Sequence, residues 1–385
     1  MRVVNKAQKR KRSLDTAGRK SLGLMLALVL TLWGCHKEPI RLGLAGVITG
    51  PWADLGIHAR NGARLAVEEI NRRGGVSGRV LELLVQNDEG TLEGAKRARE
   101  LLVAQGASVI IGHMLSTQCL DALPELERIG VPLFSPVASS ALLTGKKDLF
   151  FRLRPDSQAP ANFLARHLIT RGLDRVGILY DATNPGYTEP WVSALTQTLE
   201  SLGGHVVLTK GFSRLEKGTE VSLAEAVLEK EPRAVVLVAS AQETAQLLVA
   251  MRRAKIQSSF FGVGWAQTDR LITEAGRAAE FLILATNDPP LEEVPEAAEF
   301  VHAYRERFGM APNFAAARSY DTVRFLVQAL ESVGGRPERL RKALAESREF
   351  HGLFGRLTMD AYGDVHGESY LVGVRDGRFV KLAPQ

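Results

Sequence analysis

The segment Val109-Ile-Ile-Gly-His-Met-Leu-Ser-Thr117 joins a short β-branched run to a polar loop, and the fold can be read outward from it. A helical pattern follows at residues 120–129, and a second apolar run, Val131-Pro-Leu-Phe134, comes directly after that pattern. This order predicts a strand, a helix and a parallel strand. The same kind of run predicts further strands at residues 40–48, 80–86, 176–180, 206–208, 234–238 and 260–263.

Helical patterns separate these predicted strands along nearly the whole chain. The first places five apolar residues on one helical face, Ala59, Ala63, Ala66, Val67 and Ile70, and Gly74-Gly75 ends it. Others lie at residues 92–104, 161–170, 191–202, 244–254 and 295–308. Alternating strands and helices predict an α/β fold of mostly parallel sheets flanked by helices. About 350 residues also exceed the size at which one core keeps growing, so we expect two domains.

Residues 1–34 combine a basic region with an apolar run, which is typical of a signal peptide. The apolar run at 21–34 is shorter than the roughly 20 residues that cross a membrane as a helix. Residues 1–34 hold eight of the 49 Lys and Arg and one of the 43 Asp and Glu, which leaves 41 basic and 42 acidic residues. No basic cluster for nucleic acid is evident in this nearly neutral remainder.

The signal peptide is expected to end before Cys35. Leu32-Trp33-Gly34-Cys35 resembles the lipobox of bacterial lipoproteins, in which the cysteine is acylated, although Trp33 departs from the usual small residue. We therefore predict lipidation at Cys35 and a short tether at 35–39. The alternatives are an ordinary secreted protein or an uncleaved anchor. With Cys35 acylated, Cys119 alone remains and no internal disulfide can form.

Polar loops after the predicted strands hold the candidate ligand-binding residues, because ligands of open α/β sheets bind at the carboxyl ends of strands. Ser116 and Ser139 follow consecutive strands, and each hydroxyl could either cap a helix or help cradle a carboxylate. Tyr187 follows the turn-forming Asn184-Pro-Gly186 and could simply pack beside it. Trp265 follows Gly264 at a strand end, where it could be a core residue or a ligand platform.

Several motifs together carry a resemblance to a known family. Three motifs resemble the amino-terminal part of that family's sequences: Gly43-Leu-Ala-Gly46, Thr49-Gly50-Pro51 and Ala66-Val-Glu-Glu-Ile-Asn71. Three later motifs also match: Phe151-Arg152, Ser319-Tyr-Asp321 and Gly355-Arg-Leu-Thr-Met-Asp360. Over roughly residues 40–380 the chain resembles the Leu/Ile/Val-binding protein family, the receptors of branched-chain amino-acid-type ABC transporters.

The resemblance implies a type I periplasmic-binding-protein-like fold: two α/β lobes joined by three crossovers, closing on a ligand like a hinge. Residues 40–156 plus 288–354 would form lobe 1, and residues 157–287 plus 355–385 would form lobe 2. By matching motifs, Ser116 would receive a ligand carboxylate, helped by the N–H groups around Val137 and by the Ser139 hydroxyl. Lobe 2 would supply Tyr187, Ser240 and Trp265.

The chain departs from the family at the position of an acidic residue that pairs with the ammonium group of an amino-acid ligand. Gly264-Trp265 stand there, and a buried ammonium without a countercharge costs several kcal/mol. One possibility is that another acid serves, with Asp321, Asp181 and Glu243 as candidates. The other is a ligand without an α-ammonium, with Trp265 stacked on an apolar or aromatic carboxylate.

The function expected from the sequence is therefore an exported receptor. It would capture a small carboxylate-bearing molecule, such as an amino acid, and deliver it to an ABC permease from a lipid-anchored position at the periplasmic or cell-surface face. No enzymatic activity, metal or cofactor is expected, because phosphate-loop, metalloprotease and nucleophile-elbow motifs are absent. No nucleic-acid partner is expected either, because residues 35–385 show no basic cluster. The alternatives are a sensing or scaffolding lipoprotein with a degenerate cleft, a receptor for an aromatic acid lacking an amine, a sensor ectodomain and a sugar-repressor-type regulator.

Overall fold

The first of two large sheets contains five strands, all of them parallel. The structure is a computed structural model that describes residues 37–213, 215–216 and 218–383. The strand order is β2-β1-β3-β4-β5, with β1 (Ile40–Gly46), β2 (Leu81–Asn87), β3 (Ile110–Ile111), β4 (Leu133–Ser135) and β5 (Phe150–Arg152). An order of 2-1-3-4-5 is a doubly wound arrangement, and its topological switch point lies between β1 and β3.

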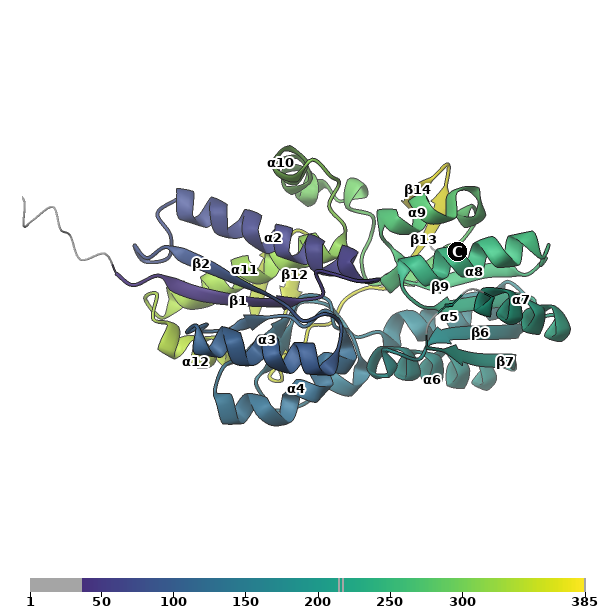
Figure 1. Cartoon of the computed structure of the whole chain (residues 1–385), viewed down its shortest axis with the longest axis horizontal. Helices are drawn as coiled ribbons and strands as arrows, with labels where there is room; N and C mark the ends of the chain where they lie inside the picture. Colours follow the sequence, from purple (N-terminus) through teal and green to yellow (C-terminus); the bar gives the residue numbers. More distant parts are fainter. Residues whose placement is uncertain (1–36, 214, 217, 384–385) are drawn as a thin grey trace, which may run out of the picture. The chain divides into compact units, whose positions relative to one another are not determined.

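Helices cover both faces of this sheet (Figure 1). On one face, β1 side chains share an apolar core with α2 (Ala53–Arg72) and α11 (Phe314–Ser332), which pack against each other. On the other face, a second core joins α3 (Leu92–Ala104) to α4 (Ser116–Ile129). The remaining helices of this lobe are α10 (Ala298–Phe308) and α12 (Leu340–Glu346).

The second sheet repeats the same topology and adds two strands. Its order is β14-β13-β10-β9-β8-β6-β7. The parallel part consists of β6 (Arg175–Asp181), β7 (His205–Phe212), β8 (Ala234–Val238), β9 (Ser259–Val263) and β10 (Ile283–Thr286). The antiparallel strands are β13 (Tyr370–Arg375) and β14 (Arg378–Lys381). The predicted α/β fold with two lobes is confirmed.

Helices flank the second sheet as well. One core joins β6 and β8 to α5 (Gln158–Thr170) and α6 (Pro185–Ser201), and another joins the sheet to α7 (Thr219–Lys230), α8 (Ala241–Arg253) and α9 (Asp269–Ala275). Short 3-10 helices are η1 (Ala141–Leu143), η2 (Gly264–Ala266), η3 (Gly276–Ala279), η4 (Leu291–Glu293), η5 (Pro295–Ala297) and η6 (Pro337–Arg339). Within the described residues, no helix has the length and hydropathy needed to cross a membrane.

The chain passes between the two sheets three times: after β5, after β10, and between β12 (Gly355–Thr358) and β13. The third passage lies later than the expected boundary at residue 355. β12 pairs with β11 (Glu349–Gly352), and Leu357, Met359 and Val365 share the apolar core that contains Phe134. Residues 355–365 therefore belong to lobe 1, because their apolar side chains are buried against its sheet.

A buried ion pair fixes this late segment to the first sheet. Arg152, at the end of β5, donates from Nε to Asp364 Oδ1 at 2.8 Å and from its two Nη atoms to Ser140 O and Thr144 Oγ1. The other Asp364 oxygen accepts from the backbone N–H of Gly145 at 2.8 Å. Both side chains are almost fully inaccessible to water, so every charged atom depends on these partners.

We predict that Asp364→Asn lowers the free energy of unfolding by about 3–5 kcal/mol, because it leaves the Arg152 guanidinium buried without a countercharge. Glu127→Gln, which breaks the exposed Arg341–Glu127 pair, is the matched control and should cost less than about 1 kcal/mol. Urea denaturation followed by circular dichroism measures both values. Equal small losses in the two variants would contradict the prediction.

Candidate ligand-binding site

The loops at the carboxyl ends of strands from both sheets surround one small cavity. It contains about 270 Å³ of space not filled by atoms, with its opening to solvent included, and about 20 Å³ of it admits the centre of a water molecule. Its lining consists of Leu55, Met114, Ser116, Val137, Ser139, Arg154, Asn184, Tyr187, Trp265 and Phe314. Because about 10–15 Å³ holds a single water, a larger ligand enters only if the two lobes or their side chains move apart.

The structure brings five of the predicted site residues to this cavity. They are Ser116, Val137 and Ser139 from lobe 1, and Tyr187 and Trp265 from lobe 2, and all five are buried. They converge because parallel strands end at the same edge of a sheet, and the two such edges face each other across the cavity. Loops distant in sequence thus form one site.

Ser116 begins α4, but it does not perform the capping role weighed for it. Leu115 occupies the N-cap position, and no side chain caps this helix. Among the described residues the Ser116 hydroxyl has no hydrogen-bond partner, and it lines the cavity beside the first turn of α4. The start of a helix carries free N–H groups and a partial positive charge, which together favour an anionic ligand group.

The Ser139 loop is shaped by hydrogen bonds from neighbouring residues. Ser135 Oγ donates to the His113 carbonyl at 2.7 Å and accepts from the Ala138 N–H at 3.0 Å. These bonds hold the backbone between Ser135 and Ser139 against the end of β3. The loop therefore presents both the Ser139 hydroxyl and the Val137 side chain to the cavity.

Aromatic rings form the lobe 2 side of the cavity. Tyr187 and Trp265 meet edge to face with ring centroids 5.7 Å apart, and Trp52 of lobe 1 lies 6.3 Å from Trp265. Burial raises the pKa of Tyr187 well above its ordinary value, so its hydroxyl stays neutral. Asn184 and Pro185 begin α6 instead of forming only a tight turn, and this start directs Tyr187 inward.

Direct hydrogen bonds join the two lobes at both sides of the cavity. Thr117 donates from its N–H and its hydroxyl to Asn184 Oδ1, at 3.2 and 2.9 Å, and its hydroxyl accepts from the Gly186 N–H at 2.9 Å. A Cβ atom at position 186 would lie 2.7 Å from Leu120 Cδ1 and 3.0 Å from the Thr117 backbone, so glycine favours this close approach. Thr268 donates to Asp54 at 2.8 Å on the other side.

Arg154 is a cavity residue that the sequence did not single out. Its Nε donates to Asp288 Oδ2 at 2.8 Å, and its Nη1 donates to the Val137 carbonyl and to Ser139 Oγ at 3.1 and 3.2 Å. Its guanidinium also stacks over the Phe314 ring at 4.8 Å. Arg154 lies in the first crossover, three residues after Phe151 of the family motif Phe151-Arg152. The sequence around it does not distinguish an arginine that contacts a ligand from one with a structural role.

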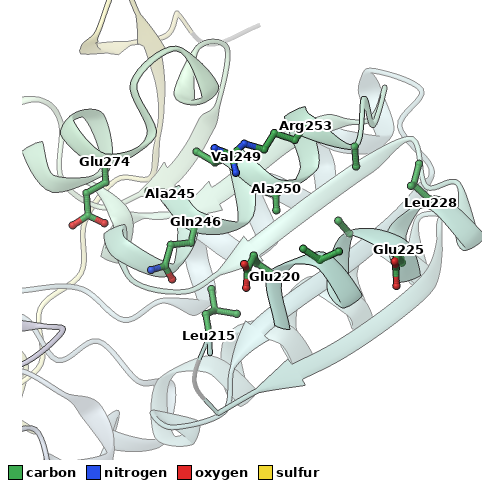
Figure 2. A pocket seen from close by; sticks show the side chains of 13 residues that line it. Leu215, Glu220, Glu225, Leu228, Ala245, Gln246, Val249, Ala250, Arg253 and Glu274 are labelled. Carbon is green, nitrogen blue, oxygen red and sulfur yellow. The ribbon is translucent and has the colours of Figure 1, made fainter. Parts of the chain in front are cut away.

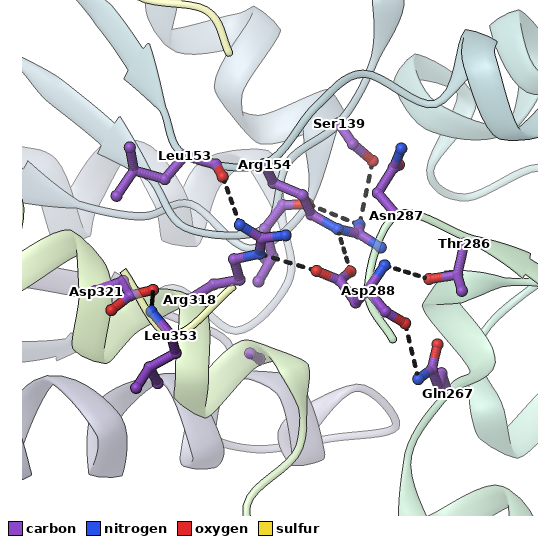
Figure 3. Close-up of polar contacts among 12 residues, drawn as sticks. Ser139, Leu153, Arg154, Gln267, Thr286, Asn287, Asp288, Arg318, Asp321 and Leu353 are labelled. Atoms are coloured by element: carbon purple, nitrogen blue, oxygen red, sulfur yellow. Dashed lines mark hydrogen bonds and ion pairs between the residues drawn. The ribbon is translucent and has the colours of Figure 1, made fainter. Parts of the chain in front are cut away.

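Asp288 is shared between two arginines, as Figure 3 shows. Arg318 of α11 donates from Nε to Asp288 Oδ1 at 2.8 Å, on the opposite side from Arg154. Burial alone raises the pKa of Asp288, but the two guanidiniums outweigh burial and hold it below the ordinary value. Asp288 therefore remains ionised, and the three side chains together carry one net positive charge at the edge of the cavity.

The two remaining predicted site residues do not line the cavity. Asp321 accepts from the Leu353 N–H at 2.8 Å and pairs with Arg324, and Figure 3 shows it turned toward Leu353, on the far side of Arg318 from Asp288. It anchors the segment before β12, so the proposal that it neutralises a ligand ammonium is not supported. Ser240 precedes α8 and donates its hydroxyl to Glu243.

Glu243 belongs to a group of three carboxylates beside the cavity, with Asp181 from lobe 2 and Asp54 from lobe 1. Burial raises the pKa of Glu243 from its ordinary 4.5 to about 7, and the nearby Asp181 carboxylate adds to this effect. Arg270 and the backbone N–H of Glu243 oppose it. Burial also raises the pKa of Asp181, whose Oδ2 atom has no partner among the described residues. None of the three carboxylates lines the cavity.

We predict that Glu243 makes the stability fall as pH rises. The folded protein holds this proton more tightly than the unfolded chain does, so the stabilisation is complete below about pH 4.5 and is lost as the pH passes 7. Glu243→Gln should match the unmodified protein at pH 4 and exceed its free energy of unfolding by roughly 3 kcal/mol at pH 8. Urea denaturation at both pH values measures the difference. The exposed Glu100→Gln is the control, and a Glu243→Gln difference independent of pH would refute the prediction.

A larger groove lies between α7 and α8 on lobe 2, with about 770 Å³ that admits the centre of a water molecule against about 20 Å³ in the cavity (Figure 2). Its walls are mainly aliphatic, and its charged residues are Glu220, Glu225, Glu274 and Arg253. Among its described lining residues there is no hydroxyl group, and three carboxylates accompany one guanidinium. The groove also lies along helices instead of at the carboxyl ends of strands. It therefore lacks the strand-end position that makes the cavity between the lobes the candidate ligand site.

Comparison with known proteins identifies the family. The family described as periplasmic binding protein matches residues 39–378. The chain belongs to the periplasmic binding protein family. A Leucine-, isoleucine-, valine-, threonine-, and alanine-binding protein of Pseudomonas aeruginosa is 26% identical over 341 residues, which cover 87% of this chain and 89% of that protein. The Leu/Ile/Val-binding protein of Escherichia coli is 26% identical over 333 residues, covering 86% and 89%.

Solved structures share the fold of this periplasmic binding protein. A branched-chain amino acid transporter substrate binding protein of Streptococcus pneumoniae, in complex with isoleucine, superposes with a TM-score of 0.82 at 21% identity, over 90% of this chain and 100% of that one. A solute binding protein of R. palustris, in complex with benzoate, gives 0.80 at 20% identity over 89% and 95%. The relatives are binding proteins, which confirms the prediction that the chain is not an enzyme, and the family is extracytoplasmic.

Proposed function

We propose that this chain is the solute-binding receptor of an ABC importer and captures a small carboxylate-bearing molecule in the cavity between its lobes. The observation that carries the proposal is the convergence of Ser116, Ser139 and the start of α4 on one side of a small cavity, opposite Tyr187 and Trp265. Hydroxyl groups, free N–H groups and a helix dipole suit a carboxylate, and the rings suit an apolar body.

Hinge closure is the proposed mechanism of capture. The ligand first docks on lobe 1 at Ser116, Val137 and Ser139, and lobe 2 then covers it with Tyr187 and Trp265. The Thr117–Asn184 and Asp54–Thr268 contacts form only when the lobes meet, so they add to the ligand's own contacts in favouring the closed state. An ABC permease would recognise the closed receptor. The carboxylate ligand is an amino acid or a related acid, since relatives of this fold have been solved with isoleucine and with benzoate.

We predict that an acid able to occupy the cavity raises the unfolding temperature of the full-length protein by a few degrees, since ligand at about 100 times its Kd adds roughly 2.7 kcal/mol. The probes are leucine, isoleucine, phenylalanine, benzoate, 3-phenylpropanoate and 4-methylpentanoate in a thermal-shift assay. Small-angle scattering with the same probe should show a smaller radius of gyration. Ser116→Ala should weaken binding about tenfold or more, through a lost hydrogen bond to a charged group.

The matched control is Ser108→Ala, which removes a lobe 1 hydroxyl that donates to the Arg41 carbonyl and does not line the cavity. This variant should bind the probe with unchanged affinity. Binding without compaction would reject hinge closure. If no probe shifted the unfolding temperature, the receptor function would give way to the alternative of a sensing or scaffolding protein with a degenerate cleft.

We also propose that the receptor is held at the membrane by acylation of Cys35, a residue outside the described part of the chain. The support is the resemblance of Leu32-Trp33-Gly34-Cys35 to a lipobox after a signal peptide. Expression in a bacterial host should give a membrane-associated product whose amino terminus is a lipid-modified Cys35 by mass spectrometry. Cys35→Ser should abolish the modification, whereas Cys119→Ser should leave it intact because the Cys119 side chain is buried. A mature protein that begins elsewhere would exclude the anchor.

A further inference from the structure

The charge inside the cavity constrains what the ligand can carry. Among the ten lining residues, Arg154 is the one with an ionised side chain, and no carboxylate lines the cavity. The nearest acidic partner, Asp288, already accepts from both Arg154 and Arg318 at 2.8 Å. One carboxylate cannot fully neutralise both guanidiniums, and the next carboxylate, Asp321, interacts with Arg318 on the side away from Asp288, so Arg154 is left without a counterion of its own. Buried charges are stable when they are paired, so a bound anion would complete this cluster.

The Arg154 guanidinium still has a donor to offer. Its Nε and Nη1 atoms are occupied by Asp288, Val137 O and Ser139 Oγ, whereas its Nη2 atom makes no hydrogen bond to any described residue. A Cβ atom at position 264 would lie 3.0 Å from Nη2 and would also collide with Thr286 Oγ1, so glycine leaves the space that the guanidinium occupies. The free donor thus sits at the end of β9, directly before Trp265, and beside Ser139.

An ammonium group would be poorly placed in this cavity. It would have no carboxylate partner among the lining residues, and it would share a small space with the Arg154 cation. The carboxylates of Asp54, Asp181 and Glu243 lie outside the lining and accept hydrogen bonds from Thr268, Thr183 and Ser240. Desolvating an ammonium without a counterion is costly, and a neighbouring like charge adds to the cost.

The rest of the lining suits a flat apolar group. Tyr187, Trp265 and Phe314 present three rings, and Leu55, Met114 and Val137 supply aliphatic contact. Aromatic groups gain from edge-to-face or offset contacts with such rings in addition to the burial of their area. We propose that the ligand is an aromatic carboxylate without an ammonium group and that Arg154 receives its carboxylate. This inference rests on the receptor function proposed above and narrows its substrate class.

The test uses pairs of ligands that differ only in the α-ammonium group. The Kd values of 3-phenylpropanoate and phenylalanine, and of 4-methylpentanoate and leucine, are measured on the full-length protein by isothermal titration calorimetry, with 3-phenylpropanamide as the neutral analogue. In each pair the acid should bind at least about tenfold more tightly than the amino acid, the amide should bind weakly, and 3-phenylpropanoate should bind more tightly than 4-methylpentanoate.

Variants at Arg154 separate a ligand contact from a structural role. Arg154→Gln should weaken binding of 3-phenylpropanoate about tenfold or more and reduce its advantage over phenylalanine, whereas Arg154→Lys should keep that advantage because it keeps the charge. Arg152→Gln is the matched control: Arg152 is equally buried and also pairs with a carboxylate, but it does not line the cavity. Its Kd ratio between the paired ligands should be unchanged. The ratio does not depend on the folded fraction, so instability of a variant does not mimic the effect.

Three results would overturn all or part of the inference in distinguishable ways. If phenylalanine or leucine bound as tightly as its ammonium-free partner, the inference would fail and the receptor function would stand. If no acid, amino acid or amide bound the unmodified protein, the inference would fail together with the receptor function. Tighter binding of 4-methylpentanoate than of 3-phenylpropanoate would reject the aromatic part of the proposal and leave the role of Arg154 to be decided by the variants.

Discussion

The carboxylate of Asp288, held between the guanidiniums of Arg154 and Arg318, connects segments that lie far apart in the chain. Arg154 lies in the first passage between the sheets, Asp288 follows β10 at the second passage, and Arg318 belongs to α11 of lobe 1. Each of these charges is buried, and an unpaired buried charge is strongly destabilising, so the three side chains hold the two passages together. Because two cations share one anion, the cluster also sets the electrostatic character of the adjacent cavity.

The equivalent topology of the two sheets explains why the cavity lies beside this cluster. Both sheets have parallel strands in the order 2-1-3-4-5, so each has its switch point between its first and third strands. The loops after β3 and β4 carry Ser116 and Ser139, and those after β6 and β9 carry Tyr187 and Trp265. Lobe 1 thereby contributes the hydroxyls of Ser116 and Ser139, and lobe 2 contributes the rings of Tyr187 and Trp265. A ligand that needs both kinds of contact stabilises the arrangement in which the lobes meet.

The polar residues beside the cavity show why function could not be assigned residue by residue. Ser240 follows a predicted strand and Asp321 lies in a family motif, but the Ser240 hydroxyl donates to Glu243 and the Asp321 carboxylate accepts from the Leu353 N–H. In each case a neighbour from the same lobe occupies the group that a ligand would have needed. Arg154 shows the converse, because it shares Asp288 with Arg318 and keeps one guanidinium nitrogen, Nη2, without a hydrogen bond to any described residue.

The sequence by itself determined the strand and helix alternation, since periodicity reflects which face of each element is buried, and it identified the family through ordered motifs. It also placed Ser116, Ser139, Tyr187 and Trp265 at strand ends, because the position of a loop after a strand is a local property. It did not reveal β5 and β10, which have three and four residues, or α11, which is buried around most of its circumference. Only the tertiary structure decided that residues 355–365 belong to lobe 1 and that Arg154 faces the cavity. The physical reason is that burial and charge pairing depend on which distant side chains meet, and no local pattern contains that information.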